Sequence, residues 1–274
     1  MSTQRIFITG GASGLGRAIA LRFARAGWRV CIADVNDARG AETLASLTPL
    51  TSQSHYLRCD VTREEDLRAA SEWLSAQWGG VDVVVNNAGV AQAGAIDEVS
   101  LSDWQWVLDI NLLGVVRGCK VFTPVFKRQG RGHFVNVASM AGLLDMPKMS
   151  SYNASKAAVV SLSETLQNEL VDDNIGVSVV CPSFFKTNLA ESLRTTDPGL
   201  RTAVGKLLER SPVTAEDIAD QIFQAVKQRD FYVLPHREAR HTWLLKRLLP
   251  RELYASLIQK RTRRIRGRPE ASRA

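Results

Sequence analysis

The sequence predicts a doubly wound α/β protein, in which helices cover both faces of about seven mostly parallel strands and a basic helical extension follows. Two observations indicate this class. Short apolar runs alternate with longer helical patterns up to about residue 235 of the 274. The short runs are apolar throughout, as expected for parallel strands that are buried on both faces.

The elements can be assigned in order along the chain. The expected strands are RIFIT (5–9), WRVCIAD (28–34), HYLRCD (55–60), VDVVVN (81–86), GHFVNVAS (132–139), IGVSVVC (175–181) and FYVLP (231–235). The expected helices between them cover 14–26, 37–47, 63–77, 101–128, 149–171 and 214–229. Three helix starts carry capping signals: Asp103, a capping box of Thr62 with Glu65, and a related pair of Thr214 with Asp217.

Composition favours one soluble domain, residues 1–235, followed by an extension at 236–274. Hydrophobic residues make up 45% of the chain, and no apolar run is long enough to cross a membrane. The beginning of the sequence lacks a signal-peptide pattern, so we expect a cytoplasmic protein. Within the domain, the segment at about 188–212 is expected to form a substrate lid.

The cysteines do not suggest a metal site. Cys31, Cys59, Cys119 and Cys181 are widely spaced, without a CxxC pair or histidines at ligand spacing. We therefore predict buried free thiols and no bound metal.

The basic charge is concentrated in the extension. Residues 236–274 contain 12 Lys and Arg against 3 Asp and Glu, whereas the rest of the chain has 23 against 25. Leucine pairs alternate with these basic residues, and Pro250 interrupts the pattern. The apolar face could pack on its own subunit or a partner. Alternatively, the segment could lie on an anionic membrane, bind an acidic protein or bind nucleic acid non-specifically; specific nucleic-acid binding is not predicted.

A glycine-rich loop follows the first expected strand and precedes a helix. Gly10, Gly14 and Gly16, with Ser13 and Leu15 between them, would let the backbone approach a pyrophosphate at the helix N-terminus. Asp34 ends the next strand, 18 residues after the third glycine, where its carboxylate can accept hydrogen bonds from the adenosine ribose. This predicts NAD(H) rather than NADP(H), although Arg17 could reach a phosphate.

Six short motifs share their order and spacing with one known family. They are TGGASGLG (9–16), CDV (59–61), NNAG (86–89), IN (110–111), VNVAS (135–139) and Tyr152-x-x-x-Lys156. Together they resemble the short-chain dehydrogenase/reductase family of NAD(P)-dependent oxidoreductases, which has a Rossmann fold. The resemblance covers about residues 5–235.

The resemblance implies a set of site residues. The catalytic tetrad would be Asn111, Ser139, Tyr152 and Lys156, with Asn111 positioning a water that relays protons from Lys156. Besides the glycine loop and Asp34, the implied cofactor-binding residues are Asp60, Val61, Asn87, Ala88, Gly89, Tyr152, Lys156, Pro182, Phe185 and Thr187. Ser183 stands where the family usually has glycine, so we expect a small adjustment of that loop.

The Tyr152/Lys156 pair also suits the chemistry directly. Alone, such a pair is more often a solvated surface contact. A tyrosine can transfer protons near neutral pH only if its pKa falls from about 10. A lysine ammonium about 5 Å away, at an effective dielectric of about 20, contributes roughly 3 kcal/mol, or about two pKa units. Ser139 would hold the substrate oxygen.

The loop before Tyr152 suggests an apolar substrate pocket. Apart from Met1, every methionine lies there, and the candidate substrate contacts are Ser139, Met140, Leu144, Met146, Met149, Tyr152 and Phe184. Flexible thioethers fit a hydrophobic secondary alcohol or ketone that is steroid-like, retinoid-like or long-chain. Alternatively, these side chains only pack the loop.

Other functions remain open from the sequence. A 3-oxoacyl carrier-protein reductase could recruit an acidic carrier through the basic extension, but Asp34 argues against the NADPH that this reaction usually takes. A non-catalytic nucleotide-binding scaffold could also work through the extension. By resemblance we expect a homodimer or homotetramer that associates through helices 101–128 and 149–171.

Overall fold

The computed structural model describes residues 3–51, 53–144, 146–187, 191–195 and 197–262. These residues contain a seven-stranded sheet in the order β3-β2-β1-β4-β5-β6-β7, in which every pair is parallel. The strands are β1 (Arg5–Thr9), β2 (Arg29–Asp34), β3 (Ser54–Arg58), β4 (Val83–Asn86), β5 (Gly132–Val137), β6 (Ile175–Val180) and β7 (Tyr232–Val233). The predicted doubly wound fold is confirmed.

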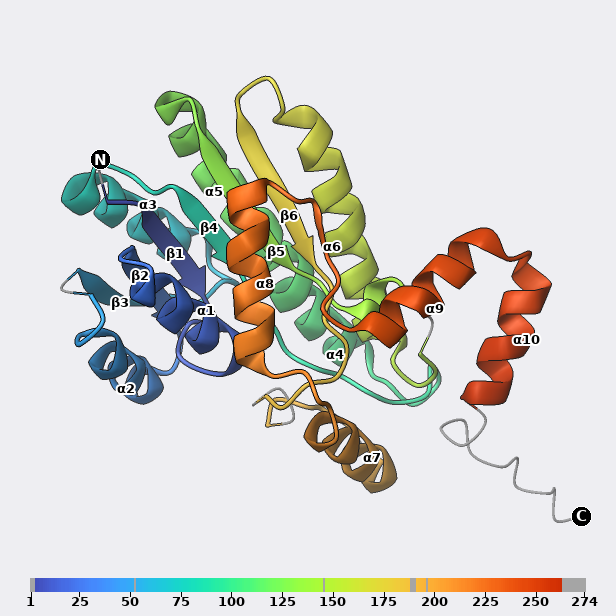
Figure 1. Ribbon diagram of the computed structural model, residues 1–274. Coiled ribbons are helices and arrows are strands. Elements are labelled where there is room, and N and C mark those ends of the chain that lie inside the picture. The colour runs from blue at the N-terminus through green and yellow to red at the C-terminus, as the bar shows by residue number, and fades with distance from the viewer. Residues whose placement is uncertain (1–2, 52, 145, 188–190, 196, 263–274) are drawn as a thin grey trace, which may run out of the picture.

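Helices cover both faces of the sheet (Figure 1). On one face lie α1 (Gly14–Arg25), α2 (Asp37–Leu47) and α8 (Ala215–Gln228), which bury a core around Phe23, Ile32 and Ile222. On the other lie α3 (Glu64–Trp78), α5 (Gly114–Gln129) and α6 (Ser150–Glu169), with a core around Phe7, Phe122 and Phe134. The continuously apolar strands are thus explained by burial on both sides.

The long helix expected at 101–128 is interrupted. It consists of α4 (Leu101–Leu108), a π-helical turn (Asp109–Leu113) and α5. A π-turn inserts one residue into the helix and occurs frequently at functional sites. Here it carries Asn111, which is completely buried.

Two of the three capping predictions need correction. The Thr62/Glu65 box is wrong because the Thr62 hydroxyl donates instead to Asp60 Oδ1 at 2.8 Å, and Arg63 is the N-cap of α3. Helix α4 begins at Ser100, whose Oγ accepts from the Asp103 amide. Only the capping box of Thr214 and Asp217 on α8 is confirmed.

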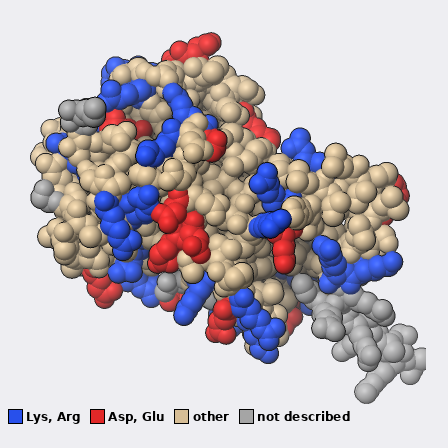
Figure 2. All heavy atoms as spheres, in the orientation of Figure 1, with Lys and Arg blue, Asp and Glu red and all other residues tan. Residues whose placement is uncertain are grey.

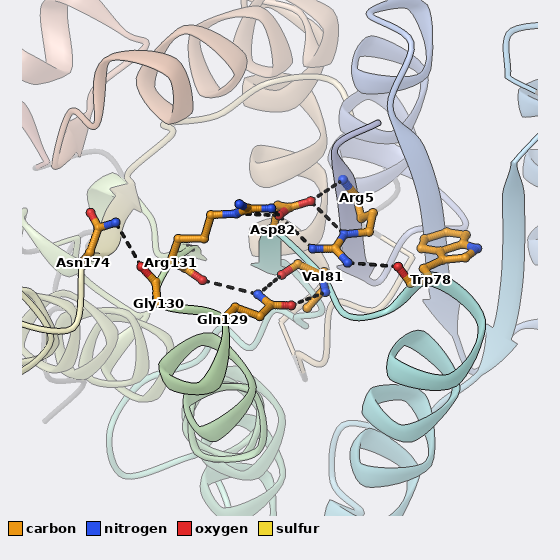
Figure 3. A network of polar contacts seen from close by, with 8 residues as sticks. All are labelled: Arg5, Trp78, Val81, Asp82, Gln129, Gly130, Arg131 and Asn174. Atoms are coloured by element: carbon orange, nitrogen blue, oxygen red, sulfur yellow. Dashed lines mark hydrogen bonds and ion pairs between the residues drawn. The ribbon is translucent and has the colours of Figure 1, made fainter. Parts of the chain in front are cut away.

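A polar network closes the end of the sheet that lies away from the cofactor cleft (Figure 3). Arg5 Nε and Nη2 each donate to the Asp82 carboxylate at 2.9 Å, and Arg5 Nη1 donates to the Trp78 carbonyl at 3.0 Å. Gln129 Nε2 donates to the Val81 carbonyl at 2.7 Å, and Gln129 Oε1 accepts from the Val81 amide. These contacts join the starts of β1 and β4 to the ends of α3 and α5.

The extension forms two helices, α9 (Arg237–Leu248) and α10 (Arg251–Arg261), separated at Pro250 as the sequence predicts. Helix α9 touches the core through Ala239 and Trp243. Five of the 12 basic residues of the extension fall at 263–274, outside the described residues, and the domain division at 235/236 stays a prediction. In the described part of the chain, no helix has both the length and the apolar character needed to cross a membrane.

The four cysteines are buried and free, as predicted. Burial raises the pKa of each thiol, to about 12 for Cys59, Cys119 and Cys181, because a buried thiolate loses its hydration. They are therefore protonated, unreactive core residues.

Candidate active site

A cleft of about 670 Å³ opens at the carboxyl ends of β1, β2 and β4, where the strand order reverses between β1 and β4. Doubly wound sheets bind ligands at this position. Of the predicted cofactor-binding residues, those that line it are Gly10, Ser13, Gly14, Leu15, Asp34, Asp60, Val61, Asn87, Ala88, Gly89, Tyr152, Lys156, Pro182, Phe185 and Thr187. Gly16 does not line it.

The glycine loop has the shape that a dinucleotide needs. Gly10 and Gly14 have φ of 62° and 50°, where a side chain would be strained, and a Cβ on Gly10 would lie 2.9 Å from the Ala88 Cα. A Cβ on Gly16 would lie 2.1 Å from the Gly10 carbonyl oxygen. Gly16 therefore lets the first turn of α1 pack against the loop, and Gly14 and Leu15 at the start of this helix line the cleft.

Asp34 is held in the cleft by backbone donors. Its Oδ2 accepts from the Ala12 amide and its Oδ1 from the Asn36 amide, both at 3.1 Å. Arg39, which was not among the predicted site residues, also lines the cleft and pairs with Glu191 at 2.7 Å. Arg17 borders a neighbouring hollow and donates to Ser46 instead.

Tyr152 and Lys156 lie on the inner face of α6, beside the ends of β4 and β5. Both are buried, and Lys156 Nζ lies 5.9 Å from the Tyr152 ring centroid. The ammonium donates to the Val137 carbonyl at 2.9 Å, and a Cβ added to Gly89 would lie 3.5 Å from Nζ. The absence of a side chain at Gly89 thus leaves the room that the lysine needs.

Ser139 follows β5 and faces the tyrosine. Its hydroxyl donates to the Pro182 carbonyl at 3.3 Å and accepts from the Ala141 amide at 3.1 Å. These bonds hold Ser139 in the wall of an apolar pocket, next in the chain to Ala138, which lines the cleft.

The pKa of Tyr152 is raised, whereas we expected the nearby lysine to lower it. Burial raises the pKa of Tyr152, and contact with the Ser139 side chain offsets this only in part. Burial also lowers the pKa of Lys156 to about 8, since its ammonium is taken out of water. Our expectation included the attraction between the Lys156 ammonium and the tyrosinate, but not the free-energy cost of burying both charges.

Asn111 fastens the loop that follows β4. Its Oδ1 accepts from the Val90 amide at 2.8 Å, while its Nδ2 donates to the Val90 carbonyl at 2.9 Å and to Ser155 Oγ at 3.2 Å. A Cβ added to Gly89 would lie 3.1 Å from Asn111 Oδ1, so the asparagine and Lys156 flank the same glycine.

A second, apolar pocket of about 110 Å³ adjoins the cleft. Every predicted substrate contact lines it: Ser139, Met140, Leu144, Met146, Met149, Tyr152 and Phe184. Leu193, Val204 and Leu208, which were not among the predicted substrate contacts, also line the pocket. The last two lie on α7 (Pro198–Glu209), which Asp197 caps. Its apolar residues at 200, 204 and 208 have helical spacing, a signal that could have revealed it.

The described part of the segment expected to form a lid is tied to the body at Arg194. Its backbone pairs with Ala91 and Ala93, its guanidinium lies 3.7 Å from the Trp106 ring centroid, and it forms an ion pair with Asp103 at 3.1 Å. Residues 188–190 and 196 of the expected lid lie outside the described residues.

The loop with Ser183 in place of glycine is held by a residue that the sequence analysis also missed. No described residue of this loop has positive φ, so the serine causes no backbone strain. The Ser183 amide donates to His236 Nδ1 at 3.1 Å, and His236 Nε2 lies 3.0 Å from the Phe184 carbonyl oxygen. This pattern requires neutral histidine with its proton on Nε2. Burial lowers the pKa of His236, which favours that form.

The fold and the cleft are those of a dinucleotide-binding protein, and comparison with known proteins specifies the family. Residues 4–198 match the family described as short chain dehydrogenase. The chain therefore belongs to the short-chain dehydrogenase/reductase family, enzymes that act on CH–OH groups with NAD(P).

Three similar proteins illustrate the relationship. A short-chain dehydrogenase/reductase from Burkholderia phymatum, solved in complex with NAD, is 34% identical, with a TM-score of 0.85 over 90% of this chain and 93% of that chain. The CLA biosynthesis dehydrogenase/reductase of Lactiplantibacillus plantarum is 32% identical, covering 95% of this chain and 92% of that protein. The Mycobacterium tuberculosis protein named "Probable oxidoreductase EphD" is 33% identical over 90% of this chain, which spans only 43% of that relative's length.

Proposed function

We propose that this enzyme interconverts a hydrophobic secondary alcohol and its ketone with NAD(H). The observation that carries this proposal is the meeting of two cavities at Tyr152. One is the cleft with Asp34 at its far end, and the other is the pocket lined by methionine, leucine and phenylalanine side chains.

The preference for NAD(H) rests on Asp34. Two backbone amides orient its carboxylate toward the adenosine end of the cleft, where a ribose 2′-hydroxyl can donate to it. A 2′-phosphate would be repelled by the same charge. Arg39 could attract that phosphate, but its guanidinium is already paired with Glu191.

Each member of the tetrad has a proposed task. NAD(P), when bound, accepts or supplies the hydride. Tyr152 takes the proton from the alcohol oxygen, or returns it to the ketone, and Ser139 donates a hydrogen bond to that oxygen. Lys156 favours the tyrosinate by its positive charge, since a pKa of about 8 leaves it mostly protonated at neutral pH. Asn111 holds the Val90 segment; a proton relay from Lys156 stays a prediction.

The substrate class follows from the apolar pocket. Its walls supply thioether, isobutyl and phenyl groups, and Ser139 and Tyr152 supply hydroxyls, with Tyr152 lining the cleft as well. At about 110 Å³ the pocket is smaller than a steroid-sized ligand needs. Rotation of the flexible methionines or movement of α7 must therefore accompany binding of a bulky substrate.

We also propose a homodimer or homotetramer associating through the segment that contains α4 and α5 and through α6. The non-catalytic scaffold loses its support, because the chain belongs to a family of enzymes and all four tetrad positions are retained. A 3-oxoacyl carrier-protein reductase remains less favoured because of Asp34.

The decisive experiment removes the tyrosine hydroxyl. Tyr152→Phe is expected to lower kcat by about 100-fold or more while NADH still binds, because only the proton-transfer group is lost. Turnover would be followed by NADH absorbance with a panel of hydrophobic and short polar alcohols and ketones. Tyr232→Phe, which changes a tyrosine outside both cavities, is the control.

The panel separates the two parts of the proposal. Turnover that persists in Tyr152→Phe would remove the catalytic assignment. Higher kcat/KM for short polar alcohols than for hydrophobic ones would instead remove the substrate class and leave the chemistry intact.

A further inference from the structure

Helices α9 and α10 form a V that stands out from the body of the molecule (Figure 1). The V has defined contacts. Trp243 packs on Tyr232 with ring centroids 5.2 Å apart, and Lys246 Nζ donates to the Leu143 carbonyl at 2.9 Å. Arg261 reaches back from α10 to Thr242 Oγ1 at 3.4 Å. The two helices are therefore held in place and still leave most of their surface uncovered.

The uncovered surface is rich in leucine. None of the 12 residues of α9, all of them described, is buried. The exposed leucines are Leu244, Leu245, Leu248, Leu253 and Leu257. Leu248 and Leu253, on either side of the bend, are 80% and 57% exposed. Several large exposed apolar side chains so close together indicate an interaction surface.

The same surface is strongly basic. Between residues 237 and 262 there are seven Lys and Arg residues but only two acidic ones, Glu238 and Glu252. In the space-filling view the two helices form a largely uncharged area bordered mainly by Lys and Arg side chains (Figure 2). An occupant must therefore accept leucine side chains and supply negative charge.

This combination favours a lipid surface over a second copy of the chain. A second copy would bring the same excess of positive charge against the first, and like charges face to face are unfavourable. An anionic bilayer offers both components, since leucines can enter the acyl boundary while lysine and arginine remain among phosphate and carboxylate groups.

We propose that α9 and α10 form a docking surface for anionic membranes, with Leu248 and Leu253 entering the bilayer. Through the bond between Lys246 and Leu143, this surface is connected to the loop that lines the apolar pocket. The docking proposal does not depend on the substrate class, and its test requires no turnover.

The experiment is flotation of the full chain with phosphatidylcholine vesicles that contain or lack phosphatidylserine. We expect binding to the vesicles with phosphatidylserine, weakened by high salt because surface charges are then screened. The double variant Leu248→Ser/Leu253→Ser should bind at least about tenfold more weakly. The matched control, Leu50→Ser/Ile96→Ser, replaces two exposed apolar residues outside the V and should bind like the wild type.

NADH binding and light scattering on the same variants complete the test. Equal vesicle binding by both double variants would overturn the proposal. A second pair of results would also overturn it: the wild type does not bind vesicles, and Leu248→Ser/Leu253→Ser dissociates an oligomer that the wild type forms. The V would then be a contact between subunits. Binding to heparin but not to vesicles would assign the surface to soluble polyanions.

Discussion

His236 uses both ring nitrogens to hold the loop between the cofactor cleft and the apolar pocket. Nδ1 accepts from the Ser183 amide, and Nε2 donates to the Phe184 carbonyl. A protonated imidazole carries hydrogen on both nitrogens, so it cannot accept from Ser183. Because burial lowers the pKa of His236, the neutral form persists into mildly acidic solution.

From this we predict an acid-dependent loss of kcat/KM in the wild type, beginning as the pH falls through the lowered pKa of His236. His236→Ala should lower kcat/KM by up to about 30-fold near neutral pH, because two hydrogen bonds of about 1 kcal/mol each are lost, and should remove this acid limb. The measurement is a pH profile of kcat/KM beside that of His241→Ala, an exposed histidine on the same helix. An acid limb unchanged in His236→Ala would contradict the assignment.

Asp34 and Arg39 together allow a test of cofactor choice. Asp34→Ala removes the carboxylate that would repel a 2′-phosphate, and Arg39 remains nearby to attract one. We expect the kcat/KM ratio of NADH over NADPH to fall by about tenfold or more in this variant. In Asp34→Ala/Arg39→Ala it should fall less. A wild type that already prefers NADPH would refute the role of Asp34.

At the scale of elements, the pairing of Arg5 with Asp82 ties β1 to the start of β4. The two side chains are only 11% and 12% exposed. Burial alone would raise the pKa of Asp82, but the bonds from Arg5 outweigh it and hold the pKa below its usual value. The carboxylate is thus ionised and depends on the arginine.

Arg5→Met should destabilise the fold by about 3 kcal/mol, because it leaves a largely buried carboxylate with the exposed Arg131 as its one remaining ion-pair partner and the backbone amide of residue 5 as a further donor. Urea unfolding monitored by tryptophan fluorescence measures the loss. Arg68→Met, which removes an exposed arginine that pairs with Glu64 on α3, is the control and should cost at most about 0.5 kcal/mol. If both variants lost a similar amount of unfolding free energy, the buried Arg5–Asp82 pair would contribute no more to stability than an exposed ion pair.

At the scale of the whole molecule, a histidine buried in the sheet makes stability depend on pH. His133 on β5 lies 2.8 Å, Nε2 to Oγ, from Ser178 on β6. Burial, together with the charge of the nearby Arg229, lowers the pKa of His133 from 6.5 to about 4. Between these values the unfolded chain binds the proton more tightly than the folded one. Stability is therefore complete above about pH 6.5 and is lost as the pH falls toward 4.

The expected loss from His133 between pH 7 and pH 5 is about 2 kcal/mol in the free energy of unfolding. His133→Gln should show a correspondingly smaller decrease over this interval, since glutamine does not titrate. Denaturation curves at both pH values check this, with His241→Gln as the control. A decrease as large in His133→Gln as in the wild type would assign the acid sensitivity to other groups.

Much of the fold could be predicted because its signals are local. Strand runs, helix periodicity and the glycine loop each depend on neighbouring residues, and the spacing of Tyr152 and Lys156 places them on one helix face. The predictions of local structure were wrong where a residue had more than one possible partner or where the apolar pattern carried no signal. Thr62 had an alternative partner in Asp60, and the π-turn around Asn111 leaves no trace in the apolar pattern.

By itself, the sequence determined the order of the elements, the cleft at the strand ends and the motifs that border it. Only the tertiary structure decided what meets across long separations: Arg5 with Asp82, His236 with Ser183, and Leu208 with the methionine loop. The tertiary structure also decided that the pKa of Tyr152 is raised rather than lowered. The physical reason is the same in each case, because burial and long-range contact depend on how the whole chain packs.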